Sequence, residues 1–352
     1  MKKKVKISFI GAGFMAQIAH IRNFKKNKKV QLWDVADYDH KMALGVKKKF
    51  GFKGVATSDA KTILNNKPDG VVIIVQRPLM LNLIKQSFKK KLNVMSEKPP
   101  AYSHAEYMKC KKLAGKKIWI KGYNRRCDPV VRYFKKNLKS YHDTFGDLLN
   151  VKYEILLGNS YMGEKHKVKP TLQKKIWKGV RNKFPHWLST KYKSLYEYHL
   201  NSACHYFDLF DFFKIEPVKA YNSFINKDIF QSSFVGKFRK NFPHCNLLIT
   251  NSRVKGWEEN ITFFFKNGNC KINFEAPLNK KRSHKLTITN AVNGKVTTIS
   301  KKNISSFEEQ TKTFINLILN SNNKDFFDFK DGENSLKYYE KVWKNFQNRI
   351  FK

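Results

Sequence analysis

Two glycines near the start of the chain have the spacing of a phosphate-binding turn. The apolar run VKISFI at residues 5–10 is typical of a buried strand, and Gly11-Ala12-Gly13-Phe14-Met15-Ala16 follows at once. In a G-x-G-x-x-G/A turn, the first glycine makes the bend, the second admits a diphosphate, and the small last residue lets the helix pack closely. The helix start then offers free N–H groups to the phosphates. A plain strand-to-helix turn is the alternative, but the context favours dinucleotide binding.

An acid follows the next apolar run at the position that such a site requires. Asp37 ends the run at residues 30–36 and lies 26 positions after Gly11. A carboxylate there can accept hydrogen bonds from the adenosine ribose and would repel an added 2′-phosphate. The sequence therefore favours NAD as the cofactor, with NADP as the alternative because nearby lysines and arginines can offset the repulsion.

A second segment contains residues that could take part in catalysis. It is Ser96-Glu97-Lys98-Pro99-Pro100, which follows the apolar residues 93–95. Open parallel sheets bind ligands at the carboxyl ends of their strands, and this segment would lie there. A lysine enclosed beside a positive charge gives up its proton more easily, because its ammonium form is disfavoured. Taken alone, Lys98 would be read as one more solvated surface lysine.

The elements that must position these residues alternate between strand and helix up to about residue 121. Continuous apolar strands such as VVIIV at 71–75 indicate a parallel sheet with helices on both faces. Beyond that point, longer alternating runs joined by turn signals such as Asn293-Gly294 indicate a mostly antiparallel sheet. We therefore expect an α/β Rossmann domain over residues 1–123. An α+β domain for substrate binding and oligomerisation, with a large open sheet, would span residues 124–352, and its C-terminal helix could return to the first domain.

Three motifs together resemble the Gfo/Idh/MocA oxidoreductases, the family of glucose-fructose oxidoreductase and inositol dehydrogenase. They are the glycine turn, the Glu97-Lys98-Pro99 segment and the junction Gly122-Tyr123-Asn124-Arg125-Arg126-Cys127-Asp128-Pro129. The resemblance is strong over residues 5–130 and looser beyond. It implies a second domain with an open sheet that pairs subunits, and therefore a dimer or tetramer.

The resemblance also implies roles for individual residues. Lys98 would bind the cofactor and act at the substrate hydroxyl, and a lysine beside the positively charged nicotinamide suits a general base. Glu97 would orient Lys98 or the nicotinamide ribose, and Asn124 and Arg125 would approach the substrate. Gln76 and Arg77 stand where family members often carry a Thr-Pro segment, and we expect them at the cofactor, although a surface charge at a helix start explains Arg77 equally well.

Members of the family commonly carry a second catalytic pair, an Asp and a His four positions apart on one helix. This chain has Asn201 and His205 there, so hydrogen bonding is retained and the ionisable carboxylate is lost. His205 can exchange a proton near neutral pH, and with Lys98 it would manage proton transfer. A satisfied core histidine is the alternative for His205, and a structural amide for Asn201.

Charge and cysteine content narrow the class of protein. The 70 Lys+Arg against 27 Asp+Glu give a net charge of +43, which suggests either a polyanion partner or a drift in composition. Scattered lysines that greatly outnumber arginines favour drift, so nucleic acid is not the expected partner. The five cysteines are widely spaced and odd in number, which indicates reduced thiols in a cytoplasmic protein, with neither disulfides nor a metal site. No apolar run reaches the length of a membrane span.

The sequence thus predicts an NAD(P)-dependent oxidoreductase. It would transfer a hydride between nicotinamide and a carbinol carbon of a sugar, a cyclic polyol or a nucleotide-linked sugar, and the basic surface would tolerate an anionic substrate. The alternatives are a redox-silent NAD-binding scaffold, suggested by Asn201, and a polyanion-binding protein, suggested by the charge.

Overall fold

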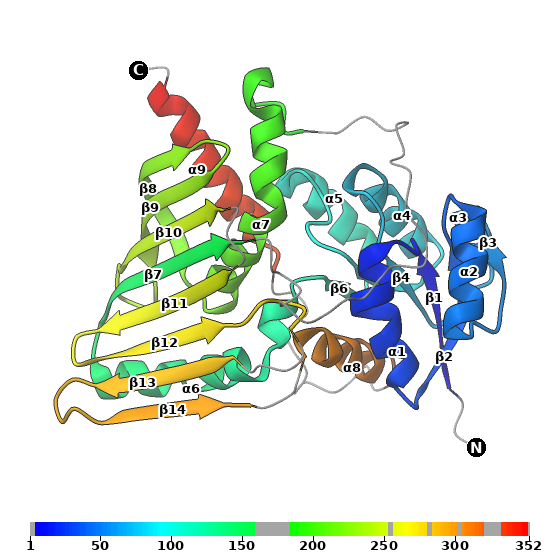
Figure 1. Ribbon diagram of the computed structural model, residues 1–352. Helices are drawn as coiled ribbons and strands as arrows, with labels where there is room; N and C mark the ends of the chain where they lie inside the picture. The colour runs from blue at the N-terminus through cyan, green and yellow to red at the C-terminus, as the bar shows by residue number, and fades with distance from the viewer. Residues whose placement is uncertain are drawn as a thin grey trace. The chain divides into compact units, whose positions relative to one another are not determined.

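A computed structural model describes residues 4–158, 184–252, 256–279, 284–301, 305–319 and 332–350 of the chain (Figure 1). These residues form two compact units. The first holds residues 4–124, 184–185, 307–319 and 332–333, and the second holds the others. Segments from both ends of the chain therefore build the first unit.

The first unit is built on a six-stranded sheet in the order β3-β2-β1-β4-β5-β6, and every neighbouring pair is parallel. The strand order reverses between β1 and β4, which is where open α/β sheets bind ligands. Strands β1 and β4 are buried almost throughout, as their apolar sequences require. The strands are β1 (Val5–Ile10), β2 (Val30–Ala36), β3 (Ala56–Thr57), β4 (Gly70–Ile73), β5 (Asn93–Ser96) and β6 (Trp119–Lys121).

Helices cover both faces of this sheet. On one face, side chains of α1, α2 and α8 join a single apolar core with the strands. On the other face, the Trp119 ring lies against Phe88 of α4 at 5.5 Å and against Tyr107 of α5 at 5.0 Å. The helices are η1 (Ala16–Ile21, a π-helix), α1 (Arg22–Lys26), α2 (His40–Phe50), α3 (Ala60–Asn65), α4 (Arg77–Lys89), α5 (His104–Ala114) and α8 (Ser306–Leu319).

Several helices begin at a side chain that caps their free N–H groups. The Asp39 carboxylate accepts from the Met42 N–H at the start of α2, and Asp59 accepts from Lys61 and Thr62 at the start of α3. Ser103 does the same for α5. These short polar residues follow strands or loops, so the local sequence sets where each helix starts.

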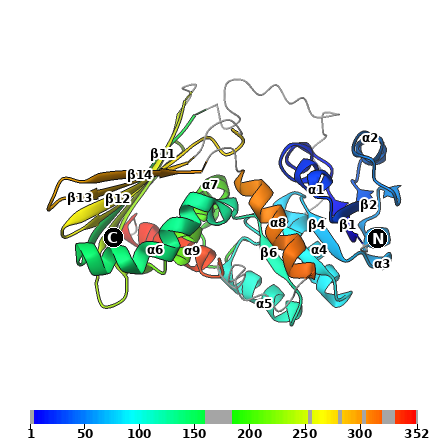
Figure 2. The same ribbon diagram turned by 90° about the horizontal axis from the view of Figure 1, so that it is seen from below.

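The helix that returns to the first unit is α8, whereas the final helix α9 (Ser335–Ile350) belongs to the second unit. Phe314 of α8 meets Phe24 of α1 edge to face, with ring centroids 6.3 Å apart. A side chain at Gly70 would come within 3.1 Å of the Phe314 ring and 2.9 Å of Ile318. Because Gly70 has no side chain, α8 can lie close to β4 and the sheet (Figure 2).

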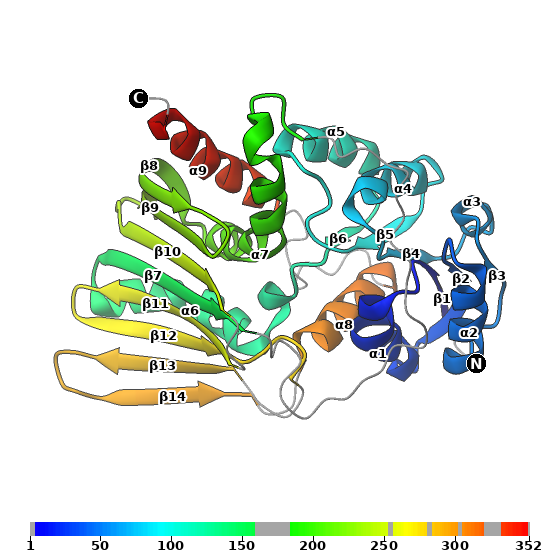
Figure 3. The same ribbon diagram turned by 45° about the horizontal axis from the view of Figure 1, so that its top comes forward.

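The second unit is built on an eight-stranded sheet in the order β14-β13-β12-β11-β7-β10-β9-β8 (Figure 3). All neighbours are antiparallel except β7 and β10, which are parallel. The expected fold class, a Rossmann domain followed by a mostly antiparallel sheet, is confirmed. The strands are β7 (Leu148–Leu157), β8 (Glu216–Ile225), β9 (Ile229–Lys237), β10 (His244–Asn251), β11 (Trp257–Phe265), β12 (Gly268–Phe274), β13 (Lys285–Asn290) and β14 (Val296–Ser300).

Three long helices cover one face of this sheet (Figure 2). They are α6 (Pro129–Phe145), α7 (Lys193–Phe212) and α9, and two short 3-10 turns, η2 (Asn124–Cys127) and η3 (Thr190–Tyr192), precede α6 and α7. Aromatic rings fill the space between the layers. Phe134 of α6 lies 4.4 Å from Phe263 of β11, and Tyr206 of α7 lies 4.8 Å from Tyr153 of β7.

The other face of the eight-stranded sheet carries polar side chains together with exposed apolar ones such as Phe224 and Phe264. Burial alternates along β11 and β12, as expected for strands with one covered face. On the uncovered face, the Ser233 hydroxyl donates to Asn246 Oδ1 at 2.9 Å, and Lys152 pairs with Glu154 at 2.9 Å. The alternation in the sequence therefore identifies the face that packs on the helices.

All five cysteines are buried as free thiols. Burial raises the pKa of Cys110 and of Cys270 to about 12, although Lys85 partly opposes the shift at Cys110. Thiols with such values are poor nucleophiles at neutral pH. Within the described residues, no helix combines the length and the hydrophobicity needed to cross a bilayer.

We expect Phe314→Ala to lower the free energy of unfolding by about 3–5 kcal/mol, because it empties a fully buried aromatic position between α8 and the sheet. Urea unfolding followed by circular dichroism measures the loss. Leu319→Ala, at an exposed position on the same helix, is the control and should change stability by less than about 0.5 kcal/mol. Equal effects of the two changes would mean that α8 does not pack as described.

Candidate functional site

The glycine turn leaves no room for a side chain at its first position. Gly11 has φ +97°, and its N–H donates to the Ala36 carbonyl at 2.7 Å. A Cβ at this position would lie 2.0 Å from the backbone oxygen of Ile74. Gly11 is therefore required both by its left-handed backbone and by the approach of the chain after β4.

Ala12, the next residue of the turn, is hydrogen-bonded through both its N–H and its carbonyl. The Ala12 N–H donates to Asp37 Oδ2 at 2.8 Å, and the Ala12 carbonyl accepts from Gln17 Nε2 at 2.8 Å. The other oxygen of Asp37 accepts from the Asp39 N–H at 3.1 Å. These bonds tie the end of β1 to the end of β2 and fix the shape of the turn.

Asp37 retains the capacity that a ribose would use. Each carboxylate oxygen offers about two lone pairs, and each oxygen of Asp37 accepts only one of the bonds above. Gly13, Phe14 and Met15 are half-buried at the start of the helix, while Ala16 is buried against the sheet. Open lone pairs on Asp37 and N–H groups at a helix start fit the ribose and diphosphate of a dinucleotide.

Glu97 and Lys98 leave the sheet at the carboxyl end of β5. The Glu97 N–H donates to the Ile73 carbonyl at 3.0 Å, so the residue still pairs with β4. The Lys98 N–H donates to Glu97 Oε2 at 3.1 Å, and the peptide bond between Lys98 and Pro99 is cis. Both side chains are half-buried.

The carboxylate of Glu97 has a buried partner that the motif did not predict. His20 Nε2 lies 2.6 Å from Glu97 Oε1, and the His20 side chain is only 1% exposed. Burial raises the pKa of Glu97, but the hydrogen bond and charge of His20, together with Lys98, outweigh it and lower that pKa. Glu97 is therefore held as a carboxylate at neutral pH.

Gln76 and Arg77 lie where the chain leaves β4 and enters α4. Gln76 is the N-cap residue, and Pro78 occupies the first turn of the helix. The guanidinium of Arg77 stacks over the Tyr102 ring at 4.9 Å. Both residues are half-buried, and their contact with a cofactor stays a prediction.

Asn124 follows β6 and is buried. Its N–H donates to the Gly122 carbonyl at 2.9 Å, and only 3% of the residue is exposed. Gly122 is itself constrained, because a Cβ there would lie 3.0 Å from the Lys98 nitrogen and 3.1 Å from Glu97 Cα. The segment after β6 therefore lies directly against the Glu97-Lys98 backbone.

Arg125 makes a buried ion pair in the second unit. Its Nε and Nη2 donate to the two carboxylate oxygens of Glu259, and the Tyr153 hydroxyl donates to Glu259 Oε1 at 2.7 Å. Burial opposes the charge of Arg125, but Glu259 outweighs it and raises the Arg125 pKa. Because one edge of the guanidinium is committed to Glu259, the geometry favours a structural role, and the expected contact with substrate stays a prediction.

The neighbouring arginine anchors the helix that carries the second predicted pair. Arg126 forms a buried, two-pronged contact with the Asp208 carboxylate on α7. On the same helix, Asn201 is exposed and His205 is half-buried, four residues apart on one face. His199 is fully buried, and its Nε2 lies 2.5 Å from the Asn226 carbonyl, so it supports the fold.

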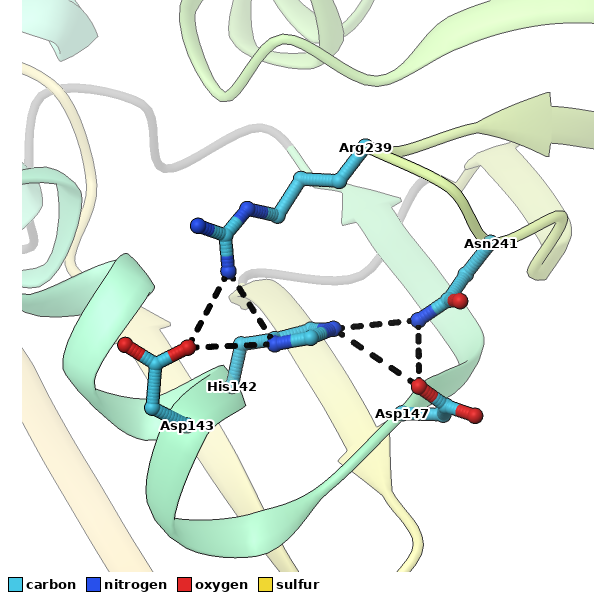
Figure 4. Close-up of polar contacts among 5 residues, drawn as sticks. All are labelled: His142, Asp143, Asp147, Arg239 and Asn241. Carbon is cyan, nitrogen blue, oxygen red and sulfur yellow. Dashed lines mark hydrogen bonds and ion pairs between the residues drawn. The ribbon is translucent and has the colours of Figure 1, made fainter.

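A separate cluster of titratable side chains fastens α6 to the turn between β9 and β10 (Figure 4). Asn241 Nδ2 donates to Asp147 Oδ1 at 2.8 Å and lies 3.0 Å from His142 Nε2. Arg239 donates to Asp143 at 3.2 Å. Both carboxylates are more than half exposed, which suits a solvated corner at a helix end.

No group of three or more His, Cys, Asp or Glu side chains among the described residues could hold a metal ion.

The chemical residues that the sequence predicted fall into two sets. Gly11, Asp37, Glu97 and Lys98 lie at the carboxyl edge of the first sheet, and Asn201 and His205 lie on α7 of the second unit.

Sequence reasoning missed Gln17 and His20, although both contact residues that it had selected. Their signal is the presence of two polar residues in the otherwise apolar stretch that follows the glycine turn. Both are buried, Gln17 at 2% and His20 at 1% exposure, and a buried polar side chain must find a partner.

A family model matches most of the first unit. Residues 5–120 match the model of the Gfo/Idh/MocA oxidoreductase family, which is described by its NAD-binding Rossmann fold. The resemblance expected from the motifs is confirmed over those residues. No curated protein matches the chain.

Solved structures share the fold of nearly the whole chain. A 3-ketoreductase from Actinomadura kijaniata, in complex with NADP and TDP-benzene, has a TM-score of 0.70 and 12% identity, covering 97% of this chain and 96% of that one. Apo scyllo-inositol dehydrogenase from Lactobacillus casei has a TM-score of 0.71 and 17% identity, covering 99% and 97%. At these identities, the likeness extends to the fold.

We expect Glu259→Gln to lower the free energy of unfolding by about 3–5 kcal/mol, because it leaves the charge of Arg125 buried without a counterion. Glu258→Gln is the matched control at the adjacent, exposed position and should cost less than about 0.5 kcal/mol. Urea unfolding of both variants makes the comparison. If the two variants unfold alike, the buried pair does not support the second unit.

Proposed function

We propose that the protein is an NAD(P)-dependent oxidoreductase, because residues 5–120 match the model of the Gfo/Idh/MocA oxidoreductase family with its NAD-binding Rossmann fold. Its reaction is hydride transfer between nicotinamide and a carbinol carbon of a sugar, a cyclic polyol or a nucleotide-linked sugar. One observation carries the proposal: the glycine turn, Asp37 and the Glu97-Lys98 pair all follow strands at the carboxyl edge of one parallel sheet.

The chain's own residues divide the binding work. Backbone N–H groups from Gly13 to Ala16 would hold a diphosphate, and Asp37 would accept from the adenosine ribose. Gln76, Arg77 and Glu97, in the segments that directly follow β4 and β5, would contact the nicotinamide end. When bound, the cofactor supplies the acceptor or donor of the hydride.

Two side chains would manage the hydroxyl proton. Lys98 Nζ would take the proton when the alcohol is oxidised and return it when the carbonyl is reduced, as a general base and acid. His205 would assist, because an imidazole exchanges protons near neutral pH. Asn124 and Asn201 would bind substrate hydroxyls with their amides, and Asn201 cannot ionise.

The substrate class rests on two kinds of support. The Gfo/Idh/MocA match identifies an oxidoreductase family, and the similar structures are of a 3-ketoreductase and of a scyllo-inositol dehydrogenase. Amide side chains such as those of Asn124 and Asn201 both donate and accept hydrogen bonds, which suits the hydroxyls of a sugar or polyol. We also propose that copies of the chain pair through the open eight-stranded sheet to form a dimer or tetramer, and light scattering would give the oligomeric mass.

A redox-silent NAD-binding scaffold is the second candidate, and one observation favours it. The position where the family carries an Asp holds Asn201, which is exposed on α7. An amide there gives no ionic help to His205. Cofactor binding without turnover on any substrate of the class would favour this candidate over the enzyme.

We expect Lys98→Met to lower kcat by about 100- to 10,000-fold, because it removes the group that exchanges a proton with the substrate. The assay follows NADH and NADPH absorbance over a panel of sugars, polyols and nucleotide-linked sugars. Lys89→Met, an exposed lysine at the end of α4, is the control and should keep wild-type turnover. Unchanged kcat in Lys98→Met would rule out the assigned role.

We expect tighter binding of NADH than of NADPH, because the carboxylate of Asp37 would repel a 2′-phosphate. Asp37→Asn removes the charge and keeps an oxygen for the Ala12 N–H, so it should reduce the discrimination about tenfold, or roughly 1.4 kcal/mol. Fluorescence titration with both cofactors measures the ratio of the dissociation constants. Asp59→Asn, which makes the same charge change at the start of α3, should leave the ratio unaltered.

A further inference from the structure

A π-helical turn lies directly after the glycine turn. Residues Ala16–Ile21 form η1, and the helix continues with α-helical geometry as α1. A π turn holds one residue more than an α turn, so it rotates the side chains beyond it by about 100°. Such turns are rare and frequently occur at functional sites. His20 lies on this one.

The imidazole of His20 is held on two sides. Its Nε2 lies 2.6 Å from Glu97 Oε1, and because an ionised carboxylate only accepts, Nε2 is the donor. The ring also meets Phe307 of α8 edge to face, with centroids 5.5 Å apart and planes at 87°. The end of β5 and the start of α8 thus fix the orientation of a side chain that is 1% exposed.

The backbone beyond Glu97 is confined as well. Glu97 Oε2 accepts from the Lys98 N–H at 3.1 Å, so the two oxygens of one carboxylate bind His20 and the Lys98 backbone. Gly122 lies so close to this segment that a Cβ there would be 3.0 Å from the backbone nitrogen of Lys98. The bond to His20 therefore fixes the oxygen of this carboxylate that the Lys98 N–H does not bind.

We propose that His20 is a positioning residue that holds the Glu97 carboxylate and, through it, the backbone that presents Lys98. His20 itself contacts neither substrate nor cofactor in this role. The inference rests on the proposed function, since it deepens the part assigned to Lys98. His20 lies within the π turn Ala16–Ile21, from which its side chain reaches Glu97.

The principal test is a set of substitutions at residue 20. His20→Phe keeps a flat ring against Phe307 and removes the donor, so kcat should fall by about 10- to 100-fold while the KM for the cofactor changes little. His20→Gln restores a side-chain N–H and should recover most of the lost kcat. A failure of His20→Gln to recover more than His20→Phe would overturn the proposal.

A buried neighbour separates positioning from stability. Phe24→Leu alters a fully buried ring on the continuation of the same helix, which packs on Phe9 and Phe314. We expect it to lower the Tm and leave kcat unchanged, whereas His20→Phe lowers kcat. If kcat falls in both variants in proportion to Tm, His20 has only a structural role.

The acidic side of the pH profile gives a second readout. His20 and Lys98 both favour the charged form of Glu97 and lower its pKa against burial. In the direction of carbonyl reduction, protonated Lys98 sets the alkaline limb, so removing the His20 donor should raise the Glu97 pKa and move the acidic limb of kcat/KM to higher pH. The limb should stay in place in Phe24→Leu. A limb that does not move in His20→Phe counts against the proposal.

A double-mutant cycle tests the contact without any turnover. The urea midpoints of His20→Phe, Glu97→Gln and the double variant are compared with that of the wild type. We expect the double variant to unfold at the same midpoint as Glu97→Gln, because His20 acts through that carboxylate. Fully additive shifts would overturn the inference. Absence of wild-type turnover across the panel would instead reject the proposed function, and the cycle would still decide whether His20 and Glu97 are coupled.

Discussion

The parallel pairing of β1 with β2 on one side and with β4 on the other is the constraint on which the candidate site depends. It brings the turn after β1 against the ends of both neighbours. Gly11 then touches the carbonyl of Ile74 with no space for a side chain, and the Ala12 N–H reaches Asp37. Contacts within the chain therefore set the shape of the turn, which lowers the entropic cost of binding a diphosphate.

Helix α8 extends this constraint to the chemical end of the same edge. Its Phe307 packs on His20, and its Gln310 donates to the Lys121 carbonyl at 3.0 Å, one residue before Gly122. Further along, Phe314 packs on Phe24 in the apolar core. The stability of the first unit and the geometry of the Glu97-Lys98 backbone thus depend on one helix contributed by a distant part of the chain.

Buried charge organises the second unit. Arg125 with Glu259 and Arg126 with Asp208 join the junction segment to β11 and to α7. Buried pairs of this kind add little net stability, but removing one partner is costly, so they restrict how these elements pack. The junction motif was expected to reach the substrate through Arg125. The Arg125 side chain pairs with Glu259 because a buried carboxylate compensates the desolvation of a buried guanidinium.

By itself, the sequence determined the elements and the chemistry of the first sheet edge. Apolar strands, the glycine spacing, Asp37 and the Glu97-Lys98-Pro99 segment are local patterns, and each has a local physical reason. Only the tertiary structure decided that His20 and Gln17 brace these motifs, that α8 rather than α9 covers the first sheet, and that Arg125 pairs with Glu259. His20 and Glu97 are 77 positions apart in the sequence, and Arg125 and Glu259 are 134 positions apart. Gln17 and His20 also lie on a π turn, which the hydrophobic periodicity of the sequence does not predict. Buried polar groups must find partners, and which partner each finds is set by packing.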